Sequence, residues 1–372
     1  MENKIGINVS FLRKPATGIG QVALNYLRTL NKNSQNIEYY LYAEEEFPEG
    51  LNLVKNFKKR VFFPPYTRDD LIRKIWWEKF LLPKKIKQDG CQSFISLYQS
   101  STILPKNIRH TMVVHDIIPK LFPEYLNNWR KKLYWKLVER AIKKADKIIA
   151  ISERTKQDLI KYLQIPQGKI EVRYLDVDEI YKKEVDEKKN QQVLEKYNLK
   201  PGYIYFGGGL EKRKNVEILL QAYKKLRNKI ERLPKLVISG KLMPELAPLV
   251  TDVEKIIKEL KLEKEVSLLD FVPQEDLPAL YKNARIFVYP SLYEGFGLPV
   301  LEAMNCGVLV ICSNSSSLPE VGGGAVEYFN PQNTGDLVAK IKAFLKDAES
   351  REKLVAKGEE RVKKFSWRNF TK

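Results

Sequence analysis

The sequence has 372 residues, of which 44% are hydrophobic, and it contains no apolar run long enough to cross a membrane as a helix. This length and composition predict a folded protein of two domains. The formal net charge is +19. The three cysteines have neither metal-ligand nor disulfide spacing. The first segment does not have the pattern of a signal peptide. Both observations predict a location in the reducing cytoplasm. With only His110 and His115 present, a histidine-rich metal site is excluded.

The basic charge is concentrated in one part of the chain. Residues 51–150 hold 22 Lys and Arg against 8 Asp and Glu, an excess of +14. Residues 251–350 hold 9 against 15, a balance of −6. The basic part therefore predicts an anionic partner, which can be nucleic acid, an anionic membrane surface or an anionic lipid-linked acceptor. A lysine-rich solvated surface is the alternative.

The first half of the chain alternates between strand and helix patterns. Residues 4–9 are predicted as a buried strand, followed by a loop with Gly18 and Gly20 and an amphipathic helix. Two glycines fall short of the three-glycine fingerprint of dinucleotide sites. Further strands are predicted at residues 38–43, 93–98, 110–114, 147–151 and 169–174, and helices at residues 69–88, 127–144 and 152–162.

The helix predicted at residues 69–88 combines aromatic and basic residues. Trp76 and Trp77 lie among lysines, as in a helix that rests on a membrane surface. The alternative is that both tryptophans are buried in the core and the lysines are solvated.

A histidine follows the strand predicted at residues 110–114. In open α/β sheets, ligands bind beyond the carboxyl ends of the strands. His115, with Asp116 next to it, is therefore a site candidate. A structural histidine is the alternative.

A second run of strands and helices follows a charged segment. Residues 178–200 are predicted as a linker between a domain at 1–177 and a domain at 201–360, with a short tail at 361–372. Strands are predicted at residues 203–206, 236–239, 266–269, 286–289, 308–311 and 325–329. Both halves therefore predict an α/β fold with doubly wound parallel sheets covered by helices on both faces.

Two glycine loops in the second half predict binding of a phosphorylated ligand. Gly295, Phe296 and Gly297 form a turn before a helix that begins at Leu298. The N-terminus of a helix attracts anions, and glycine lets a ligand approach the backbone.

Charged side chains accompany both loops. Glu294 precedes the turn and Glu302 lies one helical turn in, and carboxylates are good acceptors for sugar hydroxyls. Arg213 and Lys214 follow the other loop, Gly207–Gly209, at the start of a helix, where both charges can serve a diphosphate.

Four segments carry a resemblance to a known family: EGFGLPVLE, GGGLEKRKNVEILLQAY, HDIIPKLFPEYL and SSSLPEVGGGAV. They resemble retaining, nucleotide-sugar-dependent glycosyltransferases of family four, which have the GT-B fold. This resemblance implies two domains facing a cleft, with the donor on the second and the acceptor on the first.

The resemblance also implies roles for single residues. Glu294 would contact the transferred sugar, Glu302 the nucleotide ribose, and Lys214 the donor diphosphate. His115 would lie near the donor sugar, and the loop with Gly18 and Gly20 near the donor phosphate and the acceptor. Many members have an arginine where Gly209 stands, and whether Arg213 replaces it is left open.

The resulting hypothesis is transfer of a hexose, with retention, from a nucleoside diphosphate sugar to a glycan or lipid-linked acceptor in polysaccharide assembly. The HDIIPKLFPE and RKN segments resemble those of bacterial mannosyltransferases of polysaccharide assembly, and this resemblance implies mannose, and hence GDP-mannose. We expect no cofactor and no metal, because protein cations would stabilise the diphosphate leaving group. The alternatives are a nucleotide-sugar isomerase or epimerase of similar build, or a basic nucleic-acid-binding protein. No nucleic-acid motif is recognised, so we expect no nucleic acid as partner. The expected place of action is the cytoplasm, including the inner face of the membrane.

Overall fold

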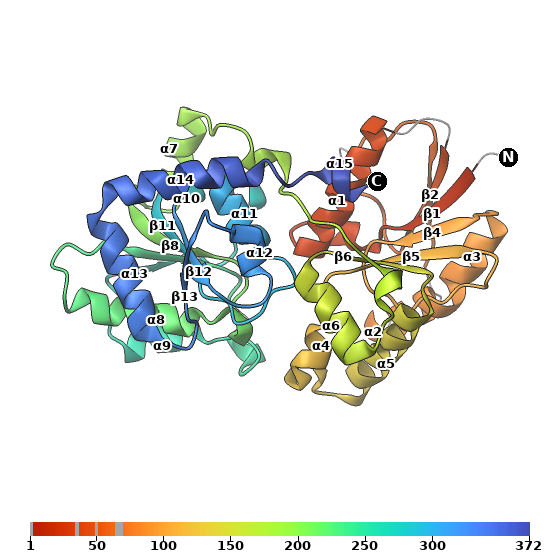
Figure 1. Cartoon of the computed structure of the whole chain (residues 1–372), viewed down its shortest axis with the longest axis horizontal. Helices are drawn as coiled ribbons and strands as arrows, with labels where there is room; N and C mark the ends of the chain where they lie inside the picture. Colours follow the sequence, from red (N-terminus) through yellow and green to blue (C-terminus); the bar gives the residue numbers. More distant parts are fainter. Residues whose placement is uncertain (1–2, 34–36, 49–50, 64–69) are drawn as a thin grey trace. The chain divides into compact units, whose positions relative to one another are not determined.

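The chain folds into two compact α/β units, which a computed structural model describes for residues 3–33, 37–48, 51–63 and 70–372 (Figure 1). One unit comprises Met1–Leu175 and Ser366–Lys372, and the other comprises Asp176–Phe365. Each unit contains one parallel sheet, which confirms the predicted fold class.

The first unit has a seven-stranded sheet in the order β3-β2-β1-β4-β5-β6-β7, and all its pairs are parallel. Its strands are β1 (Asn3–Asn8), β2 (Ile37–Ala43), β3 (Phe57–Val61), β4 (Ser93–Ser96), β5 (Arg109–Val114), β6 (Lys147–Ala150) and β7 (Ile170–Val172). The sequence prediction lacks β3. This edge strand buries only Phe57, so its residues carry little of the apolar pattern that marks a strand.

The helices of the first unit are α1 (Gly18–Asn33), α2 (Asp70–Trp76), α3 (Leu82–Gln88), α4 (Ile118–Leu121), α5 (Trp129–Lys144), α6 (Glu153–Leu163) and α15 (Trp367–Phe370). The prediction of Gly18 and Gly20 as loop residues is wrong, because both belong to the first turn of α1. The Thr17 hydroxyl accepts the Gly20 N–H at 3.2 Å. A Cβ atom at Gly20 would lie 2.0 Å from the carbonyl oxygen of Lys14, so this position requires glycine.

The helix predicted at residues 69–88 is continuous from α2 through a π-helical turn, η2 (Trp77–Leu81), into α3, and Asp69 lies outside the described residues. Its two tryptophans have opposite environments. Trp77 is fully buried and donates its indole N–H to the carbonyl oxygen of Phe62 at 3.0 Å. Trp76 is 47% exposed and Phe80 51% exposed. Only one of the two tryptophans is therefore available at the surface.

The second unit has a six-stranded sheet in the order β10-β9-β8-β11-β12-β13, again parallel throughout. Its strands are β8 (Tyr203–Gly207), β9 (Leu236–Ser239), β10 (Val266–Leu268), β11 (Ala284–Tyr289), β12 (Val310–Ser313) and β13 (Glu327–Phe329). Each of the six lies within two residues of its predicted position, because these strands are short apolar runs buried between helices.

The helices of the second unit are α7 (Glu187–Lys196), α8 (Val216–Arg227), α9 (Val253–Glu259), α10 (Leu277–Lys282), α11 (Leu298–Asn305), α12 (Leu318–Gly322), α13 (Thr334–Lys346) and α14 (Ala348–Val362). Helix α8 packs on α9 and α13, while α11 packs on α10, α12 and α14 (Figure 1). These two groups cover opposite faces of the sheet, as expected for a doubly wound domain.

The boundary segments differ from their predicted form. The predicted linker at residues 178–200 contains α7, which belongs to the second unit and is held there by Lys189 and Lys196. Their ammonium groups bind the Asp276 carboxylate at 2.8 and 2.6 Å. Within the predicted tail, residues 366–372 return to the first unit. There the Phe370 ring packs edge-on against Tyr26, with centroids 6.1 Å apart.

Candidate active site

The site in the second unit forms at the carboxyl ends of two adjacent parallel strands. Strand β8 leads through Gly207–Gly209 into a 3-10 turn, η6 (Lys212–Lys214), and then α8. Strand β11 leads through residues 290–297 into α11. Because β8 pairs with β11 on one side and β9 on the other, the chain changes direction across the sheet at this point. Ligands of open α/β sheets bind at such switch points.

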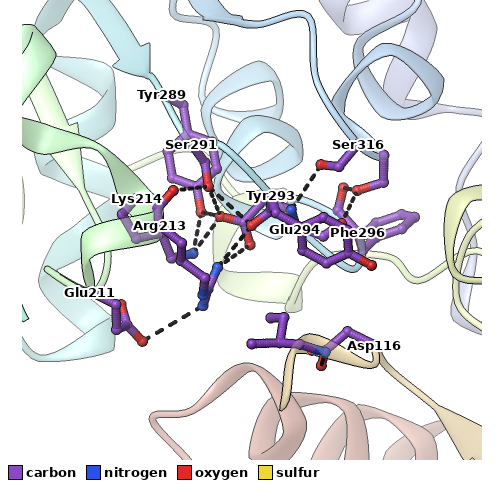
Figure 2. Close-up of polar contacts among 12 residues, drawn as sticks. Asp116, Glu211, Arg213, Lys214, Tyr289, Ser291, Tyr293, Glu294, Phe296 and Ser316 are labelled. Carbon is purple, nitrogen blue, oxygen red and sulfur yellow. Dashed lines mark hydrogen bonds and ion pairs between the residues drawn. The ribbon is translucent and has the colours of Figure 1, made fainter. Parts of the chain in front are cut away.

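The structure brings together Arg213, Lys214 and Glu294, three residues to which the sequence analysis assigns donor contacts (Figure 2). The Lys214 ammonium lies 2.7 Å from Oε1 of Glu294, and Nη1 of Arg213 lies 3.1 Å from Oε2. The hydroxyls of Tyr289 and Ser291 also donate to Oε1, at 2.9 and 2.6 Å. The cluster thus consists of a buried carboxylate shared by two cations and two hydroxyls.

The charges of this cluster keep Glu294 ionised. Burial alone would raise the pKa of Glu294, but Lys214 and Arg213 outweigh it and lower the pKa to about 2. A second carboxylate, Glu211, lies 3.7 Å from Nη2 of Arg213, so the cluster contains two cations and two carboxylates. The two cations and the N-terminus of the helix that follows are the groups that can attract an anionic ligand.

Serine hydroxyls from the loop after β12 hold the Glu294 loop in place. The Glu294 N–H donates to Oγ of Ser316 at 2.8 Å. Ser317 donates from its single hydroxyl toward the carbonyl oxygens of Glu294 and Phe296, at 3.0 and 2.7 Å. The sequence analysis noted the SSSLPEVGGGAV segment but missed the role of these serines. A run of three serines directly after a buried strand was the available signal.

The turn before α11 has the predicted geometry. Gly297 has a φ of 113°, which favours glycine, and it serves as the N-cap. In the described part of the chain, no side chain caps α11 and no acidic residue stands in its first turn. Phe296 is buried, and its ring packs edge-on against Phe365 at 5.9 Å. Anion binding by Gly295, Gly297 and Leu298 stays a prediction that this geometry allows.

Glu302 lies one turn into α11, in a different environment from Glu294. Its Oε2 accepts the Tyr281 hydroxyl at 2.9 Å. Burial raises the pKa of Glu302 to about 7, and the charge of Asp178 adds to this effect. The two glutamates of the motif thus differ in ionisation, since Glu302 is partly protonated at neutral pH. The predicted ribose contact remains a prediction.

His115 and Asp116 follow β5 at the carboxyl edge of the first sheet. The imidazole of His115 is buried and places Nε2 2.8 Å from the carbonyl oxygen of Leu97, so Nε2 carries a proton. Burial lowers the pKa of His115, so the ring is neutral and Nδ1 is an acceptor. Oδ1 of Asp116 accepts the Ile118 N–H at 3.0 Å. These contacts fix both residues at the strand end.

The described residues form neither a metal-binding cluster nor a membrane-spanning helix. Within these ranges no group of three or more His, Cys, Asp or Glu side chains is arranged to hold a metal ion. Among the helices described, none has the length and apolar character needed to cross a bilayer.

Comparison with known proteins connects both units to one family. Residues 16–179 match the model Glycosyltransferase Family 4, and residues 186–361 match Glycosyl transferases group 1. O-antigen chain mannosyltransferase B of Escherichia coli is 37% identical over 270 residues, which cover 72% of this chain and 70% of that protein. The chain belongs to glycosyltransferase family 4.

Solved structures agree with the fold of this family 4 glycosyltransferase. Sucrose-phosphate synthase from Thermosynechococcus elongatus has a TM-score of 0.76 at 17% identity, covering 98% of this chain and 95% of that one. HepE of Anabaena, solved with UDP and glucose, has a TM-score of 0.74 at 16% identity, covering 100% and 97%. The glycosyltransferase therefore has the GT-B fold.

Proposed function

We propose that this glycosyltransferase transfers mannose from a nucleoside diphosphate donor, with GDP-mannose the first candidate, to a glycan or lipid-linked acceptor in cell-surface polysaccharide assembly. The name of its relative from Escherichia coli supports the sugar and the process. The observation that carries the donor assignment is the cluster of Arg213, Lys214 and Glu294 at the switch point beside α11.

The cluster suggests how a donor binds. A diphosphate would draw Arg213 and Lys214 toward its oxygens and leave Glu294 to accept hydrogen bonds from the sugar. The two cations and the N-terminus of α11 would then stabilise negative charge as the diphosphate leaves, an interaction that grows in the transition state. Stabilisation of the leaving group by these protein cations would make an added metal or other cofactor unnecessary. Retention at the anomeric carbon is what the family resemblance implies.

Two further residues complete the proposed donor contacts. Glu302 would accept hydrogen bonds from the ribose hydroxyls, which favours its ionised form. His115 would contact the donor sugar through Nδ1, because Nε2 is engaged by the carbonyl oxygen of Leu97.

An exposed apolar stripe supports peripheral binding to the inner face of the membrane. Ile72, Trp76 and Phe80 are spaced four residues apart on one helix and are 38%, 47% and 51% exposed. Exposed Lys79 and Lys84 lie on the same helix. Aromatic residues beside lysines suit the interface of an anionic bilayer, where each basic residue contributes about 1 kcal/mol. A lipid-linked acceptor would lie at that surface.

Product analysis with a panel of nucleotide sugars tests the function. The full chain is incubated with GDP-mannose, UDP-glucose and UDP-N-acetylgalactosamine, each with and without a mannosylated lipid-linked acceptor. The proposal expects acceptor-dependent release of GDP and a lengthened acceptor. Conversion of the donor to an isomeric nucleotide sugar without any acceptor would instead identify an isomerase or epimerase.

A further inference from the structure

A cavity of about 360 Å³ lies wholly within the first unit, at that sheet's own switch point. Strand β1 pairs with β2 on one side and β4 on the other. Phe11 follows β1, and Tyr98 and Gln99 follow β4, and all three line the cavity. Residues of α1, α2, α4, the 3-10 helix η3 (Pro123–Leu126) and α5 complete it. The volume falls in the lower part of the range of small-molecule pockets, roughly 300–1,000 Å³.

The cavity wall combines aromatic rings with basic side chains. Lys74 and Lys131 are its charged lining residues among those described, and no carboxylate lines it there. The ammonium of Lys74 lies 5.0, 4.9 and 5.1 Å from the ring centres of Phe11, Tyr98 and Tyr134. Rings of this kind hold a cation by their negative faces and leave its N–H groups free to donate.

The nearest carboxylate does not take up the hydrogen bonds of Lys74. Glu78 lies 3.8 Å from the ammonium, beyond hydrogen-bond distance. Its own oxygens accept the hydroxyls of Tyr98 and Tyr134 and both the N–H and the hydroxyl of Ser101. In the described part of the chain, Lys74 therefore has a charge partner but no hydrogen-bond acceptor. Burial lowers the pKa of Lys74, so a second anion nearby would stabilise its charged form.

Further charged groups lie next to Lys74. Among the described residues, two arginines and two carboxylates form ion pairs there: Arg13, Arg73, Glu44 and Glu45. None of these four lines the cavity, whose described charged lining consists of Lys74 and Lys131. The cavity is thus a small aromatic chamber with two ammonium donors at its wall.

We propose that this cavity binds an acidic sugar unit of the acceptor, with Lys74 and Lys131 on its carboxylate or phosphate group and the aromatic rings against its pyranose face. The acceptor role rests on the proposed function, whereas binding of an acidic sugar rests on the cavity alone. The shared chemistry is a monosaccharide with an anionic group, and either a uronate or a sugar phosphate supplies it.

Binding of four small probes to the full-length chain tests the inference. Calorimetry or ligand-observed NMR compares glucuronic acid, mannose 6-phosphate, neutral mannose and inorganic phosphate. We expect the acidic sugars to bind at least roughly tenfold more tightly than mannose, the difference expected for hydrogen bonds to a charged group. Comparison of glucuronic acid with mannose 6-phosphate shows whether the cavity prefers a carboxylate or a phosphate group. Tight binding of inorganic phosphate with no sugar preference would overturn the assignment to a sugar.

Matched lysine variants locate the binding. Lys74→Met and Lys131→Met each remove one ammonium from the cavity, and Lys132→Met removes an exposed one from the same helix as Lys131. The two cavity variants should lose most of the preference for acidic sugars, and the Lys132 variant should retain it. If Lys74→Met does not fold, Lys131→Met decides alone. An unchanged preference in the folded cavity variants overturns the proposal.

GDP binding, measured on the same samples, separates this inference from the donor proposal. Wild-type chain that binds GDP but shows no preference for acidic sugars overturns the cavity assignment alone. Preference for acidic sugars without GDP binding supports the cavity and overturns GDP-mannose as the donor.

Discussion

Replacing Glu302 with Gln separates what this carboxylate costs the fold from what it contributes to nucleotide binding. The pKa of Glu302 rises from its ordinary 4.5 to about 7 because the side chain is largely removed from water. One pKa unit corresponds to about 1.4 kcal/mol, so ionised Glu302 lowers the free energy of unfolding by about 3 kcal/mol. The neutral amide of Gln avoids this cost and can still accept the Tyr281 hydroxyl.

The sign follows from proton binding in the two states. Between pH 4.5 and 7 the folded chain binds more protons at Glu302 than the unfolded chain. Its contribution to stability therefore decreases as the pH rises through this window and is lowest above pH 7. The Glu302→Gln variant should match wild type near pH 5 and exceed its stability at pH 8 by up to about 3 kcal/mol.

Urea unfolding at pH 5 and pH 8 measures this difference, with Glu359→Gln on the exposed surface of α14 as the matched control. Calorimetry on the same variants measures binding of GDP. If the ribose hydroxyls donate to ionised Glu302, wild-type affinity should rise as the pH increases through 7, and Glu302→Gln should bind about tenfold more weakly at pH 8. A Glu302→Gln variant that is no more stable than wild type at pH 8 would refute the burial argument. Unchanged GDP affinity would refute the ribose contact.

Three other perturbations probe the proposed chemistry. Lys214→Ala should lower turnover more than it weakens binding of the free nucleoside, because the ammonium serves the diphosphate; equal losses in both assays would make Lys214 a structural residue. Activity should persist in EDTA, and a loss that Mg²⁺ or Mn²⁺ restores would contradict stabilisation by protein cations alone. In vesicle sedimentation, the chain should bind anionic but not neutral vesicles, and high salt should release it. A Trp76→Ser/Phe80→Ser variant should bind several-fold more weakly, and indifference of the wild type to vesicle charge would leave the stripe without a membrane role.

Local sequence signals were sufficient for most of the fold. Buried parallel strands are apolar along their whole length, and glycine or a capping serine marks the ends of many helices. Ser152 is an example, since its hydroxyl accepts the Thr155 N–H at 3.0 Å as an N-cap. The edge strand β3 lacks such a signal, because only Phe57 of it is buried. Helix α7 has an N-cap in Asp186, but its place in the second unit depends on Asp276, some 80 residues from Lys196.

The candidate site was predictable where charged residues flank a glycine loop, as at Lys214 and Glu294. The contacts of Ser316 and Ser317 with the Glu294 loop were not predictable, because they depend on which strand lies beside β11 in the sheet. The different burial of Trp76 and Trp77 could not be predicted from the sequence either. A helix places neighbouring residues about 100° apart, and only packing decides which of them faces the core.

In the ligand-free structure, the Glu294 carboxylate binds the same two cations, Arg213 and Lys214, that the proposed donor would bind. A simple anion that attracts Arg213 and Lys214 breaks their ion pairs with Glu294 and donates no hydrogen bond to this carboxylate. The lost ion pairs would therefore weaken binding of such an anion. A nucleotide sugar bound in the proposed way presents hydroxyl donors to the same carboxylate and recovers that loss. In the proposed binding mode, this exchange would favour intact donor over inorganic phosphate and over the spent nucleoside diphosphate. After each transfer, the ion pairs of Glu294 with Arg213 and Lys214 would form again and so favour release of the nucleoside diphosphate.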